Sequence, residues 1–367
     1  MNDFIKNKAR PEIFGLDTYI PGKPIDELKR ELGMEDIVKM ASNENPLGAS
    51  PQAVKAIKAS LDILNIYPDS NCYNLKEKIA AVFGISTASI LIGNGSDELL
   101  RLIAETFINK DDEVIFAVPT FVEYEFTAKI MGAKCIKVPL QDFRHDLNAM
   151  LAAVTEKTKI IYICNPNNPT GTALDKDETD AFMQKIPPDV LVIFDEAYIE
   201  YADQDKCPSG LEYLKQNRNV IVLRTFSKLY GLAALRIGYA LTNEEIAAAV
   251  KRVFEPFNVN SLAQVAAAAA INDYVHVNNS LAVNQRGKYY LYAAFAEMGL
   301  NYVPTEANFI FVDMGQDCRQ VFQRLLKMGL IIRPADIFGF PTYIRVTIGT
   351  HVENHRFIES LKTVLRG

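Results

Sequence analysis

The chain has 367 residues with 49% hydrophobic content, a length that exceeds the usual size of one domain and predicts two. Its formal net charge of −6, without a run of Lys or Arg, excludes the electrostatic footprint of a nucleic-acid-binding protein. The longest all-apolar run, residues 265–271, is too short to span a membrane, and the first ten residues lack the apolar core of a secretory signal. We therefore expect a cytoplasmic protein whose partners include neither nucleic acid nor a membrane.

The cysteines and histidines predict neither a disulfide framework nor a metal site. The five cysteines are odd in number and contain no Cys-x-x-Cys spacing. The four histidines include one i, i+4 pair, His351 and His355, without an accompanying third ligand or carboxylate motif. We interpret the cysteines as buried or surface thiols and the histidine pair as part of a helix surface.

The first 45 residues are punctuated by proline and glycine, which favours an irregular arm that packs over other elements. Two turn-like stretches stand out there, Tyr19-Ile-Pro-Gly-Lys23 and Ser42-Asn-Glu-Asn-Pro-Leu-Gly48. Considered alone, both indicate only turns.

Two helices are predicted after the arm. Ser50 and Pro51 have the residue types of an N-cap and a first helical turn, and apolar residues at 54, 57, 61 and 64 form a stripe. A second helix, 75–83, ends at Gly84, a residue type that commonly follows a helix. Tyr67 lies between them in a turn-like segment, where its simplest interpretation is a turn residue packed on a helix.

From residue 89 onward, strands and helices alternate along the chain. Strands are predicted at 89–92, 114–118, 134–138, 159–164, 190–194 and 220–223, with helices near 99–107, 121–131, 147–155, 175–186 and 209–217. This alternation predicts an α/β domain with a mostly parallel sheet covered by helices on both faces.

A glycine-rich turn, residues 93–98, leads from the first of these strands into a helix. The N-terminus of a helix presents unpaired backbone N–H groups and the positive end of its dipole to an anion. The amides of Gly95, Ser96 and Asp97 are therefore candidates to hold a phosphate.

The stretch 221–239 carries the strongest signal in the chain. It begins as an apolar, β-branched strand and places Lys228 just past the strand end, where a mostly parallel sheet presents its ligands. A lysine between apolar neighbours loses its proton readily, and its neutral amine can form a Schiff base with an aldehyde. Arg236, with the hydroxyls of Thr225 and Ser227, is suited to a phosphate. An aldehyde and a phosphate together indicate pyridoxal phosphate as the cofactor.

Two other strand ends carry polar residues that a plain connection does not need. Asp195 follows the apolar strand 190–194, and a buried carboxylate is costly without a cation unless it only caps a helix. The pyridinium nitrogen of pyridoxal phosphate is a suitable cation. Tyr198, and Asn168 in the Asn- and Pro-rich segment 165–171, are candidates to hydrogen-bond the phenolic oxygen of the ring.

The pattern Thr-Phe-Ser-Lys-x-x-Gly-Leu-x-x-x-Arg-x-Gly-Tyr, residues 225–239, resembles the cofactor-lysine motif of the fold-type I pyridoxal-phosphate aminotransferases, especially their histidinol-phosphate aminotransferase branch. The resemblance spans Tyr19 to Arg345 and includes the order and spacing of the strand-end motifs. It implies a large domain with a mostly parallel sheet of the seven-stranded type and a small α+β domain. Leu229 and Ala234 depart from the smaller residues that this motif has at their positions.

The resemblance also implies roles for particular residues. Phe121 stands where the family has an aromatic ring, usually tyrosine, stacked on the pyridine face, although core packing also fits it. Tyr67 matches a tyrosine that reaches the cofactor phosphate of the neighbouring subunit, which implies a homodimer. Lys228, Asp195 and Tyr198 are then the catalytic residues.

The regular alternation stops after residue 239. We predict residues 1–45 as an N-terminal arm and part of the small domain, 46–245 as the large cofactor-binding domain, and 246–367 as the small C-terminal domain.

Four residues are predicted to bind the substrate: Tyr19, Asn43, Arg333 and Arg345. Arg345 alternates with apolar residues on a short strand, whereas Arg333, before Pro334, also fits a surface position.

The resemblance implies transamination of histidinol phosphate with 2-oxoglutarate in histidine biosynthesis. Two alternatives from the same branch remain open, an aromatic amino acid aminotransferase and a threonine-phosphate decarboxylase. A non-enzymatic, aminotransferase-like transcription regulator is disfavoured, because the enzyme pattern leaves no segment for a helix-turn-helix and because Lys228 is present.

Overall fold

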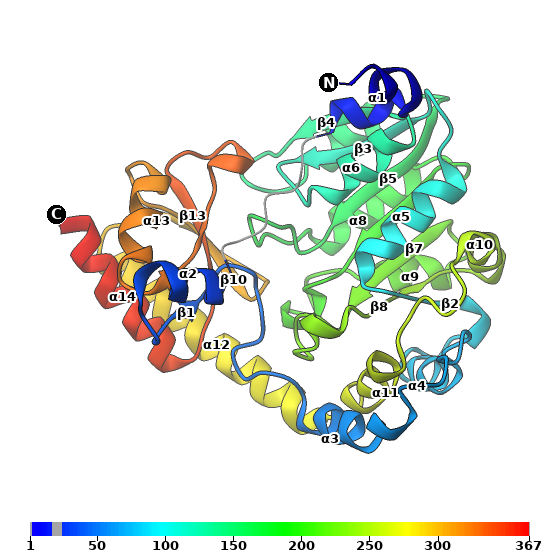
Figure 1. The fold of residues 1–367 in the computed structure, drawn as a ribbon. Coiled ribbons are helices and arrows are strands. Elements are labelled where there is room, and N and C mark those ends of the chain that lie inside the picture. The colour runs from blue at the N-terminus through cyan, green and yellow to red at the C-terminus, as the bar shows by residue number, and fades with distance from the viewer. Residues whose placement is uncertain (1, 17–23, 367) are drawn as a thin grey trace.

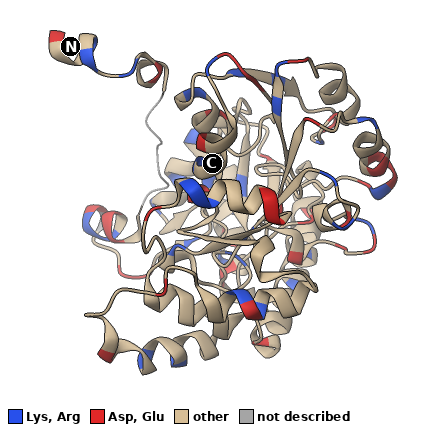
Figure 2. Ribbon diagram, turned by 90° about the vertical axis from the view of Figure 1, so that its right-hand side faces the viewer, with Lys and Arg blue, Asp and Glu red and all other residues tan. Residues whose placement is uncertain are grey.

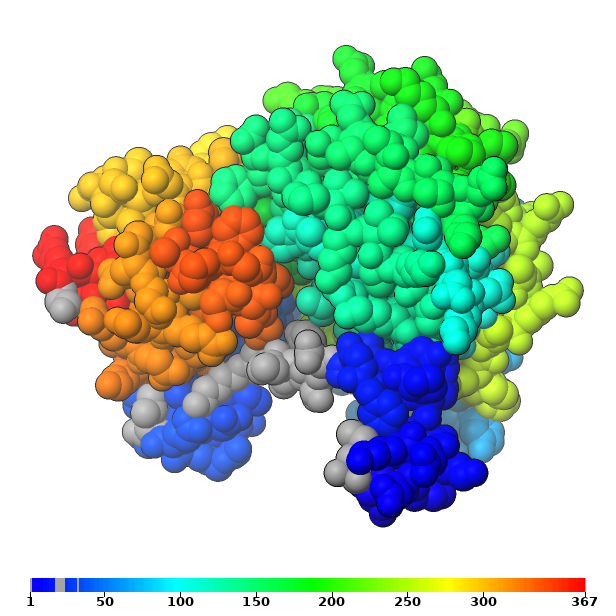
Figure 3. Space-filling view, turned by 90° about the horizontal axis from the view of Figure 1, so that it is seen from above, coloured from blue at the N-terminus to red at the C-terminus, as the bar shows by residue number. Residues whose placement is uncertain are grey.

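The computed structural model describes residues 2–16 and 24–366, which form a large and a small domain (Figure 1). The large domain is built on a twisted sheet with helices around it. Seen from above, the orange and red chain of the small domain lies beside the cyan and green large domain (Figure 3). Basic and acidic residues are intermixed along the helices in the view of Figure 2. Within the described ranges, no helix is both long enough and apolar enough to cross a lipid bilayer.

The sheet of the large domain has seven strands, as predicted. Their order across the sheet is β2 (Ile90–Gly93), β8 (Gly238–Leu241), β7 (Val220–Thr225), β6 (Leu191–Asp195), β5 (Thr158–Cys164), β3 (Glu113–Val118) and β4 (Lys134–Pro139). The strands from β7 to β4 pair in parallel, whereas β8 runs antiparallel to both of its neighbours. The predicted α/β class with a mostly parallel sheet is confirmed.

Helices bury both faces of this sheet, so the central strands β6 and β7 are buried at every position and apolar until their carboxyl ends. Successive residues of a strand face opposite sides, and accordingly Val192 belongs to one core and Ile193 to the other. One face packs against α3 (Pro51–Ala59), α4 (Tyr73–Phe83), α7 (Leu147–Ala152), α8 (Lys176–Lys185), α9 (Gly210–Lys215) and α11 (Ser261–Ala270). The other packs against α5 (Ser96–Phe107), α6 (Glu123–Ile130) and α10 (Glu244–Val250).

The small domain has an antiparallel sheet covered by helices. Its strand order is β12 (Arg333–Pro334), β13 (Tyr343–Thr347), β10 (Phe309–Asp313) and β9 (Tyr302–Val303). Its core includes residues of α13 (Cys318–Leu326), α14 (His351–Arg366) and the second half of α12 (Tyr274–Glu297). Figure 1 shows α12 running from the large domain to the small one.

The N-terminal arm is divided between the two domains. The short helix α1 (Asp3–Lys8) lies at the top of the large domain in Figure 1. Farther along, α2 (Ile25–Leu32) and β1 (Val38–Lys39) belong to the small domain, where β1 pairs in parallel with β11 (Leu330–Ile331).

The boundary between the two domains, judged from the packing, lies later in the chain than the predicted residue 245. Helix α11 is buried in the core of the large domain, against α3 and α4. The core of the small domain begins on α12, with Leu291 and Phe295. The end of strand-helix alternation therefore marks a change of topology and not the end of the large domain, and we place the boundary within α12.

Candidate active site

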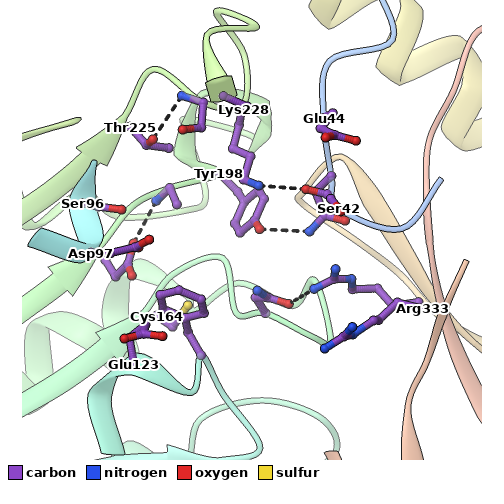
Figure 4. Close-up of a pocket in the computed structure, with 18 of the residues that line it drawn as sticks. Ser42, Glu44, Ser96, Asp97, Glu123, Cys164, Tyr198, Thr225, Lys228 and Arg333 are labelled. Atoms are coloured by element: carbon purple, nitrogen blue, oxygen red, sulfur yellow. Dashed lines mark hydrogen bonds between the residues drawn. The ribbon is translucent and has the colours of Figure 1, made fainter. Parts of the chain in front are cut away.

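A cavity of about 450 Å³ lies where the carboxyl ends of the large-domain strands meet the small domain and the arm (Figure 4). This is the edge at which a parallel sheet is expected to hold a ligand. The structure brings most of the predicted site residues to the wall of this one cavity. They are Asn43, Ser96, Asp97, Phe121, Asn168, Asp195, Tyr198, Thr225, Ser227, Lys228, Arg236, Arg333 and Arg345.

Lys228 extends from the turn after β7 into the cavity. Its Nζ donates a hydrogen bond to the backbone oxygen of Ser42 at 2.9 Å. Burial, together with the positive charge of Arg345, lowers the pKa of Lys228 to about 8. A substantial fraction of this lysine is therefore a neutral, nucleophilic amine near neutral pH.

Asp195 is the last residue of β6 and is only 3% exposed. Burial raises the pKa of its carboxyl to about 6, while hydrogen bonds work against this shift. Tyr124 donates from its hydroxyl to Oδ2 at 2.6 Å, and the backbone N–H of Ala197 donates to Oδ1 at 3.2 Å. The hydrogen bond from the Ala197 N–H is of the kind that a capping residue accepts. The hydrogen bond from the buried Tyr124 hydroxyl is not part of a cap, so capping alone does not explain the position of Asp195. A cation bound in the cavity would complete the partners of this carboxylate.

An anion cradle lies at the N-terminus of α5. Ser96 and Asp97 begin this helix, and Arg236 Nη2 donates to Asp97 Oδ2 at 3.1 Å. Gly95 has φ +84°, and a Cβ at this position would lie 2.7 Å from Arg236 Nη2, so only glycine lets the guanidinium approach the turn. Arg236 Nη1 also donates to Ser227 Oγ at 3.4 Å. Hydroxyl, amide and guanidinium donors thus converge where a phosphate can bind.

The opposite wall of the cavity joins the small domain to the large one. Arg333 and Arg345 are direct neighbours across strands β12 and β13. Arg345 donates to Asn168 Oδ1 and, at 2.7 Å, to the backbone oxygen of Ala41. Asn43 Nδ2 donates to the hydroxyl of Tyr198 at 2.9 Å, and burial raises the pKa of Tyr198 to about 12. Tyr198 is therefore protonated at neutral pH.

Two predicted residues do not line the cavity of their own chain, and a third lies outside the described residues. Gly95 lies directly behind Arg236, as above. Tyr67 is 79% exposed and stacks on Phe257 with ring centroids 4.7 Å apart. Tyr19 falls in 17–23, outside the described ranges.

Sequence reasoning missed several residues of the site. Tyr124 is the most informative, because it contacts Asp195 directly but looks in the sequence like a core residue of a helix. Other residues of the arm and of strand ends were missed as well, and they are Ala41, Glu123, Cys164, Ala197 and Ala233. Ser42 and Glu44 also line the cavity, and they belong to the stretch 42–48 that stood out in the sequence. The contact of Ser42 with Lys228 is made by a backbone oxygen, so no side-chain pattern could reveal it.

The model of the family "Aminotransferase class I and II" matches residues 35–361. This chain belongs to that family. A histidinol-phosphate aminotransferase of Moorella thermoacetica is 54% identical to it over 359 residues, or 98% of this chain and 93% of the relative. One of Caldicellulosiruptor saccharolyticus is 48% identical, over 97% of this chain and 99% of the relative. The crystal structure of histidinol-phosphate aminotransferase from Sinorhizobium meliloti in complex with pyridoxal-5'-phosphate has 30% identity and a TM-score of 0.90, over 98% of each chain.

These comparisons confirm the family resemblance inferred from residues 225–239, and the fold-type I architecture with it. The aminotransferase cavity also fits the cofactor in three independent places. Lys228 has an amine that can react with the aldehyde, and Asp195 has a buried carboxylate that can pair with the ring nitrogen. The donors of the cradle at α5 can bind the phosphate.

Proposed function

We propose that this enzyme transfers the amino group of L-histidinol phosphate to 2-oxoglutarate with pyridoxal phosphate, forming imidazole-acetol phosphate and glutamate. The observation that carries the proposal is the placement of two arginines, Arg333 and Arg345, on the cavity wall that also holds Lys228. Two guanidinium groups can grip a phosphate ester in one half-reaction and a carboxylate in the other. The relatives named histidinol-phosphate aminotransferase support this reaction, as well as a place in histidine biosynthesis and in the cytoplasm.

Pyridoxal phosphate supplies an aldehyde that condenses with amines and a protonated ring that accepts electrons. Ser96, Asp97, Thr225, Ser227 and Arg236 would hold its phosphate. Phe121 would stack on one face of the ring, and Asn168 and Tyr198 would hydrogen-bond its phenolic oxygen. The rest of the chemistry belongs to residues of this chain.

Lys228 Nζ is the group placed to take a proton from the substrate carbon that bears the amine and to return it, as a general base and acid. Its lowered pKa suits both roles near neutral pH. Asp195, ionised, would keep the ring nitrogen protonated, and the hydroxyl proton of Tyr198 is available to the phenolic oxygen because Tyr198 already accepts from Asn43. Asn43 also accepts a hydrogen bond from Thr347, so the arm and the small domain hold Tyr198 in place together.

The deciding experiment compares turnover of histidinol phosphate, phenylalanine and threonine phosphate by the same preparation with 2-oxoglutarate. We expect the highest kcat/KM for histidinol phosphate. A higher value for phenylalanine would favour an aromatic aminotransferase. Release of carbon dioxide from threonine phosphate would favour the decarboxylase.

Arg333 and Arg345 are expected to respond differently to replacement by alanine. Arg345 is 7% exposed and also bonds Asn168, so we assign it the anion common to both substrates. Arg333, with Tyr19 and Asn43, would add contacts that favour phosphate. Losing one charge-assisted hydrogen bond costs about 1.5–3 kcal/mol. Arg345→Ala should impair both half-reactions, whereas Arg333→Ala should raise the KM for histidinol phosphate much more than that for 2-oxoglutarate. Equal effects of Arg333→Ala on the two substrates would remove Arg333 from the phosphate site.

We also propose that two copies of the chain form a homodimer with shared active sites. Five large apolar or aromatic residues are at least 46% exposed in one short stretch, namely Leu61, Ile63, Leu64, Ile66 and Tyr67. Such an exposed apolar stretch is typical of an interface. A second groove, lined by Asp97, Glu123 and Arg236, adjoins the phosphate cradle and offers a place for the partner's copy of this stretch.

A subunit-mixing experiment tests the shared site. A Tyr67→Phe variant should have weakened cofactor binding, and a Lys228→Ala variant should be inactive. If Tyr67 serves the partner's site, a mixed dimer contains one site that is free of both changes. Mixing and refolding the two variants should therefore restore up to about one quarter of wild-type activity, since half of the dimers are mixed and each has one intact site. A monomer in sedimentation, or no recovery on mixing, would contradict the proposal.

A further inference from the structure

A buried ion pair lies on the side of the sheet opposite the cavity. Its members are Glu196 and Arg224, the sequence neighbours of Asp195 and Thr225. Residues alternate between the two sides of a strand, so Glu196 and Arg224 face one way while Asp195 and Thr225 face the cavity. Glu196 is 0% exposed and Arg224 is 8% exposed. The pair is therefore buried and is joined to two residues of the site by single peptide units.

The pair is made with a fork of hydrogen bonds. Arg224 donates from Nε at 3.0 Å and from Nη2 at 2.7 Å to Glu196 Oε2. The other oxygen, Oε1, accepts from the Gly210 N–H at 2.6 Å and from the Ser209 hydroxyl at 2.8 Å. The ring of Phe83 covers the guanidinium, with its centroid 4.9 Å from Cζ. Two donors of one rigid guanidinium thus meet a single carboxylate oxygen while the other oxygen is held by Gly210 and Ser209, which restricts the pair to a defined geometry.

The pair lies where the hydrogen-bond ladder between β6 and β7 ends. The last paired residues are Asp195 and Leu223, followed by one bond from the Glu196 N–H to the Leu223 oxygen at 2.9 Å. Beyond this point the segment after β6 leads to Tyr198, and the segment after β7 leads to Lys228. Just past the last backbone hydrogen bond, the side chains of Arg224 and Glu196 join the two segments.

Arg224 also reaches the far end of the segment that carries Tyr198. Its Nη1 lies 3.9 Å from Oε1 of Glu200, a second carboxylate, and burial raises the pKa of Glu200 to about 7. Glu196 and Glu200 flank Tyr198 in sequence. One guanidinium thus contacts both ends of this catalytic segment.

We propose that Arg224, through Glu196, is a positioning residue that fixes the separation between Asp195 and Lys228. The inference rests on the proposed function, because it concerns the cofactor's dimensions. The ring nitrogen and the aldehyde-bearing carbon lie opposite each other on one rigid ring. A protein that contacts both positions must hold its two strand ends at one distance, and small misplacements of reacting groups cost large factors in rate.

The test replaces Arg224 with lysine, which keeps the positive charge and loses the fork. We expect kcat to fall roughly 10–100-fold in both half-reactions, as for other residues that orient a site through a neighbour. The KM values for histidinol phosphate and 2-oxoglutarate should change little, since Arg224 touches neither substrate. The pH midpoint of the visible absorption of the bound cofactor should also shift, because Asp195 and Tyr198 move relative to the ring.

Val222→Ala is the matched control. Val222 is buried on β7, on the same side as Arg224, and has no polar group that could take part in the ion pair. Val222→Ala therefore removes packing and lowers the unfolding temperature, while the hydrogen bonds of the pair remain. It should retain kcat and the absorption midpoint at temperatures where it is folded. If Arg224→Lys behaves as Val222→Ala does, the pair is only structural and the proposal is wrong.

A second variant covers the case in which Arg224→Lys fails to fold. Glu196→Gln combined with Arg224→Met removes both charges of the pair and keeps an unbranched side chain at each position, so neither member is left as an unpaired buried ion. Glu200 loses its contact with Arg224, and its raised pKa lets it become neutral by taking up a proton. This folded double variant should show the same loss of kcat, and wild-type kcat would overturn the proposal. The proposed function is tested separately by the wild-type protein, which would refute it by binding no pyridoxal phosphate.

Discussion

Replacing Lys228 with alanine is expected to abolish both half-reactions while leaving the cofactor able to bind. The lysine is the one amine that the cavity offers within the described residues, and no neighbouring side chain can take over its proton transfer. We expect kcat to fall on the order of 10⁴-fold. Binding should persist without covalent attachment, because the α5 cradle and Arg236 do not depend on Lys228. Borohydride treatment should label one peptide, containing Lys228, in the wild type and none in the variant. Label on another lysine would contradict the assignment.

The pH dependence of cofactor uptake gives an independent check on Lys228. Only the neutral amine attacks an aldehyde. With a pKa of about 8 instead of 10.5, roughly a quarter of the amine is neutral at pH 7.5, compared with about 0.1% for an unperturbed lysine. The rate of covalent attachment to the apoenzyme should therefore rise with pH and level off above about pH 8. A rate that still increases tenfold per pH unit between pH 8.5 and 9.5 would show that burial does not lower this pKa.

The sequence was sufficient for much of the site because fold-type I chemistry is placed at strand ends. Asp195, Lys228 and Arg236 each interrupt a run of apolar or small residues. An interruption of this kind can be recognised from the sequence alone. The α/β order and the cofactor followed from these interruptions together with the family resemblance. By contrast, the role of Tyr124 could not be read, because a buried aromatic on a helix looks the same whether or not its hydroxyl meets a carboxylate.

Packing between distant segments was the other part that the sequence did not reveal. The apolar stripe predicted to bury the helix after Ser50 continues beyond its end at Ala59, and Leu61 and Leu64 are 48% and 60% exposed. Amphipathic periodicity shows that one side is apolar but not what covers it. The packing of α11 differs from the predicted boundary at residue 245 for a related reason, because this alanine-rich helix packs in the large domain although it follows the last of its strands.

Asp195→Ala is expected to separate cofactor binding from catalysis. The phosphate cradle should still hold pyridoxal phosphate, but the ring nitrogen would lose the carboxylate that keeps it protonated. The ring then accepts electrons poorly, and we expect kcat to fall on the order of 10³-fold in both half-reactions, comparable to removal of a preorganised electrostatic group. The measurement is single-turnover kinetics of each half-reaction, with cofactor occupancy determined on the same sample. Near-normal turnover would show that Asp195 only caps the segment at Ala197.

Two companion measurements show whether the charge of Asp195, and not its volume, is responsible. Pyridoxal phosphate methylated on the ring nitrogen carries a permanent positive charge, so it should restore part of the rate in Asp195→Ala and none in Lys228→Ala. Tyr124→Phe removes one hydrogen bond that favours the ionised carboxylate, and in the apoenzyme this should raise the pKa of Asp195 above about 6. When the cofactor is bound, the positive ring nitrogen opposes this rise, so the loss of kcat in Tyr124→Phe should be much smaller than in Asp195→Ala and largest at acidic pH. A Tyr124→Phe loss that is independent of pH would mean that the phenol orients the carboxylate and does not hold its charge.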